Sequence, residues 1–289
     1  MSMKLTIIDK KNTPLKTVNR TLVIENQKLP FHLIDTLLIV GENSLKTTDI
    51  TAMTDAGINI LLLSSSFTKS ALITSTAAKS TELKLAQYRI ASTIPVKIAR
   101  WILRQKITTH TKHLEAHRIN LDPAPYLERI DKADDLDALL GIEGSFSRRY
   151  FEHFFHLFPK TLHKGKRSKR PPLDPLNALM SWYYTLFYHL IAVRLIGFGF
   201  EPAIGYLHRP FRAHFALSSD LLEIFRADIN AFIYTIFADK LVMPSDFSKK
   251  GGVYLRYEGR KKLYQPFREF HTALTPKIDT AVAELRSML

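Results

Sequence analysis

Four residues between positions 143 and 223 have the side chains that bind hard metal ions. Glu143 stands between two glycines, and His208 follows the short segment Gly205-Tyr206-Leu207. Asp220 and Glu223 are three residues apart, so they would share one face of a helix near its N-terminus. One neutral imidazole with two or three carboxylates suits Mg²⁺ or Mn²⁺. Such an ion binds phosphate oxygens and lowers the pKa of a bound nucleophile, so these residues predict chemistry on a phosphodiester.

Each of these residues also has an ordinary structural explanation. Glu143 could be an exposed residue on the polar face of a helix. Asp220 could be an acid in the first turn of a helix, where it favours the helix dipole. A lone loop histidine such as His208 is usually without function, but here two acids follow it after twelve and fifteen residues. The combination therefore favours one metal site over four unrelated residues.

Two further sets of residues are weaker candidates. His110, His113 and His117 could line one helix face, but no acid stands at matching spacing, so contacts with solvated phosphates are favoured over a metal. Trp182, Tyr183 and Tyr184 could stack on bases, yet aromatic clusters of this kind are more typical of a core.

The chain is strongly basic, with 41 Lys and Arg against 27 Asp and Glu and a formal net charge of +14. This excess favours an anionic partner, with nucleic acid ahead of an anionic membrane surface. Basic residues gather at 148–149, at 160–170 and at 249–262; a charge run can be only a solvated face, but the first two groups flank Glu143. We therefore expect phosphate contacts. The expected contacts are Arg148, Arg149, Lys164, Lys166, Arg167 and Arg226.

The hydrophobic patterning predicts an α+β fold of two domains. Residues 1–78 predict a small β-rich domain, with strands at 5–8, 21–25, 36–40 and 58–63 and a short helix at 45–55. Residues 79–289 predict a larger, mostly α-helical domain. We expect long helices at 134–158, 175–196 and 219–241, the last of these being the final long helix. Asp174 before Pro175 predicts an N-cap with proline in the first helical position.

Several classes of protein are excluded or disfavoured. The chain has no cysteine, which excludes disulfide scaffolds, thiolate nucleophiles, zinc fingers and iron–sulfur clusters. Its first residues lack a long apolar stretch, so we expect no secretory signal and a cytoplasmic location. Residues 175–193 carry no acid, Lys or Arg and are about as long as a membrane span. Their Asn, Ser, Trp, Tyr and His content favours a central helix among other helices instead, so we expect no membrane partner.

Five motifs in order, with the helix and strand at 44–63, cover nearly the whole chain. They are Leu140-Gly141-Ile142-Glu143-Gly144 with Arg148-Arg149-Tyr150-Phe151, Arg170-Pro171-Pro172-Leu173-Asp174-Pro175-Leu176-Asn177-Ala178-Leu179, Gly205-Tyr206-Leu207-His208, Asp220-Leu221-Leu222-Glu223-Ile224-Phe225-Arg226, and Gly252-Val253-Tyr254-Leu255 with Glu258-Gly259-Arg260-Lys261. Together they resemble the CRISPR-associated spacer-acquisition integrases, a family of metal-dependent DNA endonucleases. Two departures are the Ser218-Ser219 pair and His189; neither removes a ligand.

This resemblance implies a fold, a site and partners. It implies a β-domain at 1–78, an α-helical catalytic domain at 79–289, and Glu143, His208 and Glu223 as ligands of Mg²⁺ or Mn²⁺, with Asp220 as a nearby accessory catalytic carboxylate. The implied partners are double-stranded DNA (protospacer and CRISPR repeat), a second copy in a homodimer, and a small ferredoxin-like CRISPR-associated subunit. The implied reaction inserts spacers into a CRISPR array by phosphodiester transesterification, or cleaves DNA.

Two alternatives remain open at this point. A non-catalytic DNA-binding assembly subunit would use the same basic surfaces without turnover. A stand-alone homologue of a mobile element would keep the chemistry but integrate its own terminal repeats.

Overall fold

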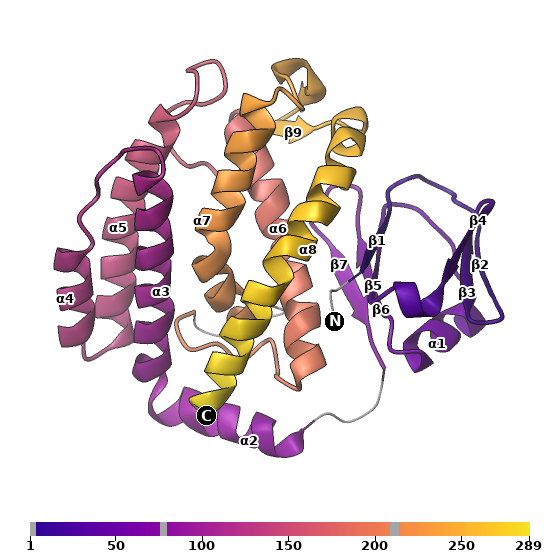
Figure 1. Cartoon of the computed structure of the whole chain (residues 1–289), viewed down its shortest axis with the longest axis horizontal. Helices are drawn as coiled ribbons and strands as arrows, with labels where there is room; N and C mark the ends of the chain where they lie inside the picture. The colour runs from indigo at the N-terminus through magenta and orange to yellow at the C-terminus, as the bar shows by residue number, and fades with distance from the viewer. Residues whose placement is uncertain (1–3, 76–79, 209–213) are drawn as a thin grey trace. The chain divides into compact units, whose positions relative to one another are not determined.

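A computed structural model describes residues 4–75, 80–208 and 214–289. By their internal contacts the residues form two compact units, and each is described by itself. One unit contains Met1–Ala78 with Tyr264–Lys277; the other contains Lys79–Leu263 with Ile278–Leu289. Most strands lie in the N-terminal part and helices dominate the rest, so the predicted α+β class is confirmed (Figure 1).

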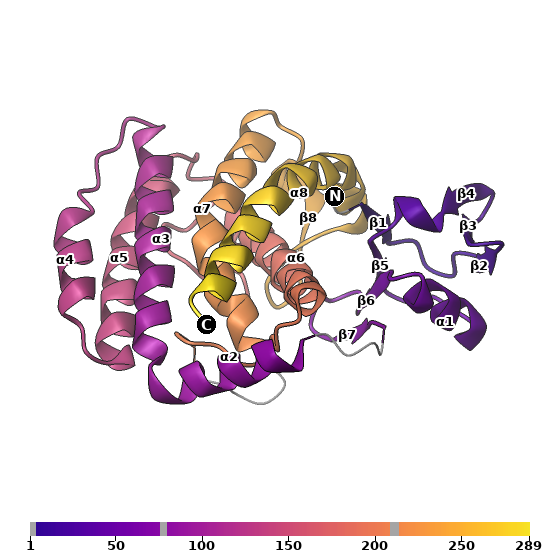
Figure 2. The same ribbon diagram turned by 60° about the horizontal axis from the view of Figure 1, so that its bottom comes forward.

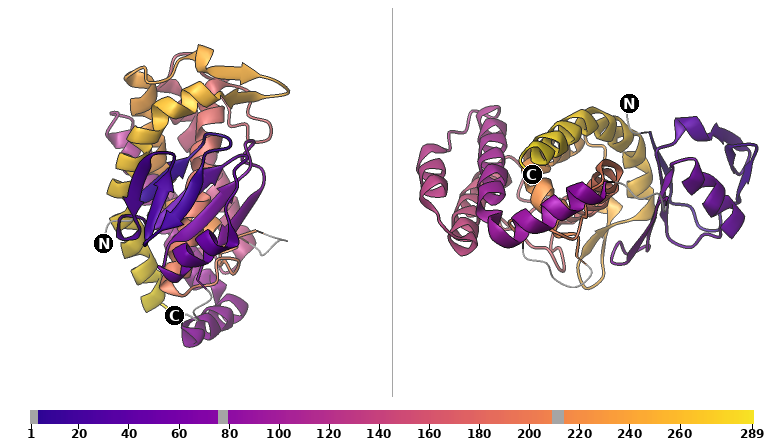
Figure 3. Two further views of the ribbon diagram at one scale, coloured as in Figure 1. Left: turned by 90° about the vertical axis from the view of Figure 1, so that its right-hand side faces the viewer. Right: turned by 90° about the horizontal axis from the view of Figure 1, so that it is seen from below.

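Two small sheets and one helix build the N-terminal part. One sheet has the order β1-β5-β6-β7, and the other has the order β2-β3-β4. In the first, β5 pairs in parallel with β1 and β6, whereas β7 is antiparallel to β6. Figure 3 shows these strands and α1 from two further sides. The bounds are β1 Leu5–Ile8, β2 Leu15–Val18, β3 Thr21–Ile24, β4 Gln27–Pro30, β5 Thr36–Val40, α1 Thr47–Asp55, β6 Asn59–Leu63 and β7 Ser70–Ile73.

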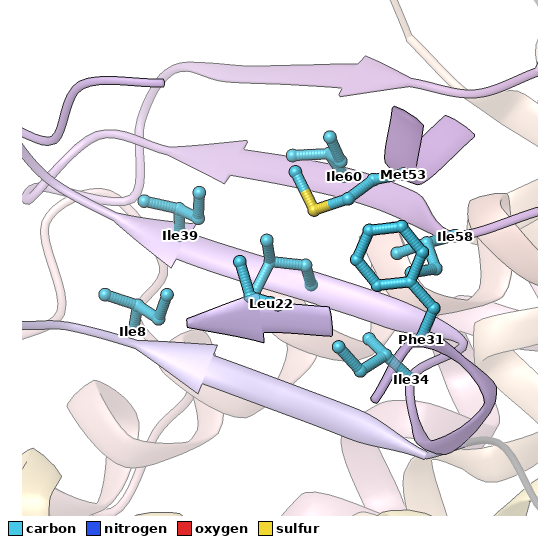
Figure 4. Packing of buried hydrophobic residues seen from close by; sticks show 9 residues of the cluster. Ile8, Leu22, Phe31, Ile34, Ile39, Met53, Ile58 and Ile60 are labelled. Carbon is cyan, nitrogen blue, oxygen red and sulfur yellow. The ribbon is translucent and has the colours of Figure 1, made fainter. Parts of the chain in front are cut away.

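A hydrophobic core joins these elements. Leu22 of β3, Leu37 of β5 and Ile60 of β6 are fully buried, and Met53 of α1 and Phe31 pack with them (Figure 4). All five residues of β5 are buried, as expected of a strand with a neighbour on each side. The four predicted strands are present, whereas β2, β4 and β7 were not predicted.

Long helices form the other part of the chain. Their bounds are α2 Thr81–Thr93, α3 Pro95–Glu115, α4 Ala124–Lys132, α5 Leu136–His156, α6 Pro175–Phe198, α7 Ala216–Ala238 and α8 Tyr257–Ser287, with a hairpin of β8 Phe247–Lys249 and β9 Val253–Leu255 before α8. Helix α3 contacts both α5 and α7, and it lies between them in Figures 1 and 2. This arrangement places one face of α3 against two helices at once.

The predicted helices at 134–158, 175–196 and 219–241 are present as α5, α6 and α7. The Asp174 side chain caps α6 by accepting a hydrogen bond from the backbone N–H of Asn177 at 2.8 Å. Helix α6 ends at Gly199, whose φ of 93° is in the left-handed region that glycine tolerates. Both ends of the helix therefore follow from local sequence.

The prediction that 219–241 holds the final long helix is wrong, because α8 follows with 31 residues. Pro266 and Pro276 lie inside α8, where proline disfavours a helix. Buried residues nevertheless recur at helical spacing through this segment, so hydrophobic burial outweighs the two prolines. The buried positions include Leu263, Phe267, Leu274, Ile278, Val282 and Leu285.

Helix α6 contains the segment whose length matches a membrane span. It contacts α7, and Asn177 and His189 are buried within it. Among the residues that the structure describes, no helix combines the length and apolar character needed to cross a membrane.

Candidate metal and nucleic-acid site

Two helices and one loop carry the four predicted site residues. Glu143 lies on α5, Asp220 and Glu223 lie on α7, and His208 lies in the loop between α6 and α7. A residue that was not predicted, Lys106 of α3, joins them. Helix α3 lies between α5 and α7 (Figure 1). From this position the Lys106 side chain reaches Glu143 of α5 and Glu223 of α7.

Lys106 links the two glutamates. Its ammonium donates hydrogen bonds to Glu143, to Ser147 Oγ at 2.9 Å and to Glu223 Oε2 at 2.7 Å. Ser147 in turn donates to Glu143 Oε1 at 2.7 Å. The Lys106 side chain is 2% exposed and that of Glu223 is 3% exposed, whereas Glu143 is 22% exposed. The two carboxylates therefore converge on one positive charge, and Glu143 is the member of the pair that solvent reaches.

Arg226 holds the other oxygen of Glu223. Its Nη1 lies 2.9 Å from Glu223 Oε1, one turn along α7, and its guanidinium lies 5.0 Å from the centre of the Tyr184 ring. Burial alone would raise the pKa of the Glu223 carboxyl, but the charges of Arg226 and Lys106 outweigh burial and hold the pKa well below its ordinary value. Glu223 is therefore a carboxylate at neutral pH despite its burial.

Asp220 organises the histidine. One oxygen of this fully buried carboxylate lies 2.7 Å from His208 Nδ1 and also accepts the His208 backbone N–H at 2.9 Å. The other oxygen accepts the backbone N–H groups of Tyr206 and Leu207 at 2.6 and 3.0 Å. With both oxygens occupied, Asp220 orients the His208 ring through Nδ1 and leaves Nε2 as the nitrogen that can bind a metal.

The His208 environment favours its protonated form. Burial lowers the pKa of the imidazole, but the hydrogen bond and charge of Asp220 outweigh burial, so the pKa is raised above its ordinary value. Glu223 adds to this rise. The two carboxylates of α7 thus act on His208 electrostatically as well as by position.

Gly205 makes the approach of the loop to α7 possible. A Cβ at this position would lie 2.8 Å from Asp220 Oδ2 and 2.9 Å from the backbone carbonyl carbon of Ala216. Both distances are shorter than a normal contact, and the backbone of α7 cannot move away easily. The glycine in the Gly205-Tyr206-Leu207-His208 motif is therefore explained by close packing against Asp220.

The predicted phosphate contacts fall into two groups. Arg148, Arg149, Lys164 and Lys166 are exposed. Arg167 instead bonds within the protein, to Asn177 Oδ1 at 2.9 Å and Ser181 Oγ at 3.1 Å, and Arg226 is engaged with Glu223 and Tyr184. Burial lowers the pKa of Arg167 to about 10. These two arginines therefore already have protein partners in the structure.

Lys106, Ser147 and Lys169 were missed as candidates. Desolvation and the charge of Arg226 lower the pKa of Lys169, whereas the charges of Glu223 and Glu143 act to raise it. The Lys169 ammonium therefore lies within the electrostatic influence of both carboxylates. The clue to Lys106 was a charged residue on the apolar face of α3, four residues after buried Ile102. Lysines are rarely fully buried unless they are paired, so that position signalled a partner.

The weaker candidates prove to be internal. His110 and His113 are buried, and His113 Nδ1 lies 2.8 Å from the Tyr150 hydroxyl, so the interpretation of these two as solvated phosphate contacts is wrong. Burial lowers the pKa of His113 to about 4. Trp182, Tyr183 and Tyr184 are buried, which confirms the core interpretation.

The donor chemistry of the site fits a hard divalent ion. Glu143, Glu223 and Nε2 of His208 carry oxygen and nitrogen donors of the kind that Mg²⁺ and Mn²⁺ accept. In the described part of the chain, no three His, Asp or Glu side chains are grouped closely enough to coordinate an ion directly. The ammonium of Lys106 instead stands between the two glutamates, which shows that they already converge on a cation.

Comparisons with known proteins agree with this architecture. The family profile "CRISPR associated protein Cas1" matches residues 6–269. A relative from Thermodesulfovibrio yellowstonii is named CRISPR-associated endonuclease Cas1 1. It is 28% identical in an alignment 290 residues long, which covers 93% of this chain and 91% of the relative.

Solved structures share the fold at lower identity. A Cas1 protein from Thermotoga maritima has a TM-score of 0.88 at 20% identity, covering 98% of this chain and 96% of that one. A casposase bound to integration product has a TM-score of 0.85 at 18% identity, with 99% and 92% covered. A chain of a Cas6-RT-Cas1–Cas2 complex has a TM-score of 0.79 at 20% identity, with 99% of this chain and 35% of that chain covered. Since the family profile spans most of the sequence, the chain belongs to the Cas1 family of CRISPR-associated proteins.

Proposed function

We propose that this protein is a metal-dependent DNA endonuclease and integrase that inserts short DNA fragments into a CRISPR array. The observation that carries the proposal is the convergence of Glu143 and Glu223 on one cation beside a histidine oriented by Asp220. Membership of the Cas1 family and the fold shared with an integration complex support the same chemistry.

Glu143, Glu223 and Nε2 of His208 would hold Mg²⁺ or Mn²⁺. When bound, the ion neutralises charge on a phosphodiester and makes an oxygen nucleophile more reactive. A DNA 3′-hydroxyl attacking phosphorus forms one phosphodiester bond as the bond to the leaving 3′-oxygen breaks; water as the nucleophile gives cleavage instead. Asp220 keeps the imidazole in the tautomer that binds through Nε2, and Arg226 keeps Glu223 ionised.

The exposed basic residues would hold the DNA backbone. Arg148 and Arg149 follow Glu143 by one to two turns of α5, and Lys164 and Lys166 lie in the loop that leads to α6. Lys169 of the same loop is exposed and lies within the electrostatic influence of Glu143 and Glu223, so it is a further candidate for a phosphate contact. Such contacts position a substrate without reading its sequence.

The proposal extends to the assembly. We place the β-rich domain at 1–78 and the catalytic domain at 79–289, with double-stranded protospacer and repeat DNA as substrates in the cytoplasm. A second copy of the chain and a small ferredoxin-like CRISPR-associated subunit complete the complex. The fold shared with a chain of a Cas6-RT-Cas1–Cas2 complex supports such a partner.

A strand-transfer and cleavage assay tests the function. Wild type, Glu143→Ala and His208→Ala are incubated with short duplexes and a repeat-bearing plasmid, in Mg²⁺, Mn²⁺ or EDTA. Glu152→Ala is the matched control, since Glu152 lies on the same helix but is exposed and pairs with Arg149. We expect metal-dependent product from wild type and the control, and none from the other two variants, while all four bind DNA.

Other outcomes separate the alternatives. Wild type that binds DNA but yields no product with either metal and with its partner subunit would favour a non-catalytic assembly subunit. Insertion of terminal repeats from a mobile element in preference to spacer DNA would favour the stand-alone integrase.

A further inference from the structure

Lys106 belongs to the site but is not explained by the proposed ligands. It comes from α3, whereas the groups it contacts come from α5 and α7. An ammonium has three donor protons, and here it has three acceptors: Glu143, Glu223 and Ser147. At 2% exposure, the charge is almost fully removed from water. Its hydrogen-bonding capacity is thus fully used inside the protein.

The charges around Lys106 are balanced before any metal is present. The two carboxylates, Glu143 and Glu223, are matched by two cations, Lys106 and Arg226. Without Lys106, the two carboxylates would face one another with one positive charge fewer to balance them. A buried charge without a partner is strongly unfavourable. Lys106 therefore stabilises the assembled form of the site.

We propose that Lys106 is a positioning residue that acts as a built-in cation, holding the two carboxylates together in the metal-free protein and opposing the divalent ion that shares them. The inference rests on the proposed function, because it takes Glu143 and Glu223 as the metal ligands. A fixed positive charge in contact with both carboxylates repels a second cation there, and this repulsion is strong because water is largely excluded. The protein thus keeps its site assembled without metal, and in return binds metal more weakly.

The test removes the charge and keeps the length of the side chain. Lys106→Met is compared with wild type by titration calorimetry with Mn²⁺ and by thermal unfolding in EDTA and in Mn²⁺. We expect a lower Tm in EDTA, Mn²⁺ binding tighter by about tenfold or more, and a larger rise in Tm when Mn²⁺ is added. Lys112→Met is the matched control, since Lys112 is exposed on the same helix, and it should leave both quantities as in wild type.

A second variant covers the case in which Lys106→Met does not fold. Combining Lys106→Met with Glu143→Gln removes one positive and one negative charge and leaves the Glu223–Arg226 pair intact, so the double variant should recover most of the Tm lost in EDTA. A double variant no more stable than Lys106→Met would overturn the role of Lys106 in neutralising the carboxylates.

The metal titration separates this inference from the proposed function. If Mn²⁺ binds wild type and binds Lys106→Met no more tightly, the opposition between ammonium and metal is overturned while the metal site stands. If Mn²⁺ binds neither protein, the proposed metal site itself is wrong, and this inference is overturned with it.

Discussion

The two halves of the candidate site are held in place by different means. In the carboxylate half, Glu143 and Glu223 come from separate helices and meet at the buried ammonium of Lys106, while the partly buried Arg226 pairs with Glu223. In the histidine half, Asp220 holds His208 by bonding three successive backbone N–H groups of one short loop. Long-range charge pairing thus builds the first half, and local backbone hydrogen bonding builds the second.

This difference separates stability from metal binding. Removing a carboxylate from the first half takes a partner from a buried cation, so it affects folding as well as chemistry. Removing the support of the histidine half releases one loop and one ring, which affects metal binding more than folding.

Glu223→Ala should have the largest effect. It leaves both Lys106 and Arg226 short of a partner in a buried environment, so the free energy of unfolding should fall by about 3–5 kcal/mol and metal-dependent product should disappear. Denaturant unfolding and the strand-transfer assay measure the two effects. Glu152→Ala, in the exposed part of α5, should change neither. A Glu223→Ala protein as stable as wild type would show that the charges are not coupled as the geometry indicates.

Asp220→Asn should weaken metal binding by about 10–100-fold, the usual effect of losing the partner of a ligating histidine. An amide nitrogen in place of one oxygen would face a backbone N–H, so the free energy of unfolding should also fall, by about 1–3 kcal/mol. Calorimetry with Mn²⁺ and denaturant unfolding provide the comparison with Glu223→Ala. Unchanged Mn²⁺ affinity would show that Asp220 does not orient a ligand.

The pH dependence should follow His208. Its raised pKa means that the folded state binds this proton more tightly than the unfolded chain does. In metal-free protein, the resulting stabilisation is fully present below the unfolded value of about 6.5 and is lost as pH rises through the higher folded pKa. A metal needs the neutral ring, so Mn²⁺ affinity should rise with pH through that folded pKa. The midpoint should move to lower pH in Asp220→Asn, and a midpoint that stays in place would exclude Asp220 as the cause.

Lys164→Ala and Lys166→Ala should have the smallest effects, because both side chains are exposed and belong to neither half. Each should lower DNA affinity a few-fold and reduce the slope of log affinity against log salt by about 0.9. Fluorescence anisotropy over a salt series measures both. Lys132→Ala, at the exposed end of α4, is the control. Slopes equal to that of wild type would remove these residues from the DNA surface.

Much of the fold could be predicted because its signals are local. The N-cap at Asp174 and the glycine at the end of α6 are set by neighbouring residues, so they could be read from the sequence. Helix α8 could not be placed by local propensity, because Pro266 and Pro276 oppose it and tertiary burial stabilises it. The short strands β2, β4 and β7 depend on pairing partners in the same way.

Site residues that belong to sequence motifs could be predicted, whereas those positioned by packing of the helices could not. Glu143, His208, Asp220 and Glu223 stand in recognisable order; in the structure Glu143 and Glu223 share Lys106 of α3, and His208 bonds Asp220. Lys106 lies 37 residues from Glu143 and 117 from Glu223, so its role depends on how α3 meets α5 and α7. The internal partners of Arg167 also arise only from folding. Residue type alone could not separate Arg167 from the exposed lysines of its loop.

The metal site is tested most directly by a Mn²⁺ titration of the purified protein followed by electron paramagnetic resonance, which counts bound ions independently of turnover. We expect a specific Mn²⁺ site in wild type and in Glu152→Ala, loss of that site in Glu223→Gln, and strong weakening in His208→Ala. Unaltered Mn²⁺ binding in both of the last two variants would contradict this expectation, because the ion would then be held by residues other than His208 and Glu223.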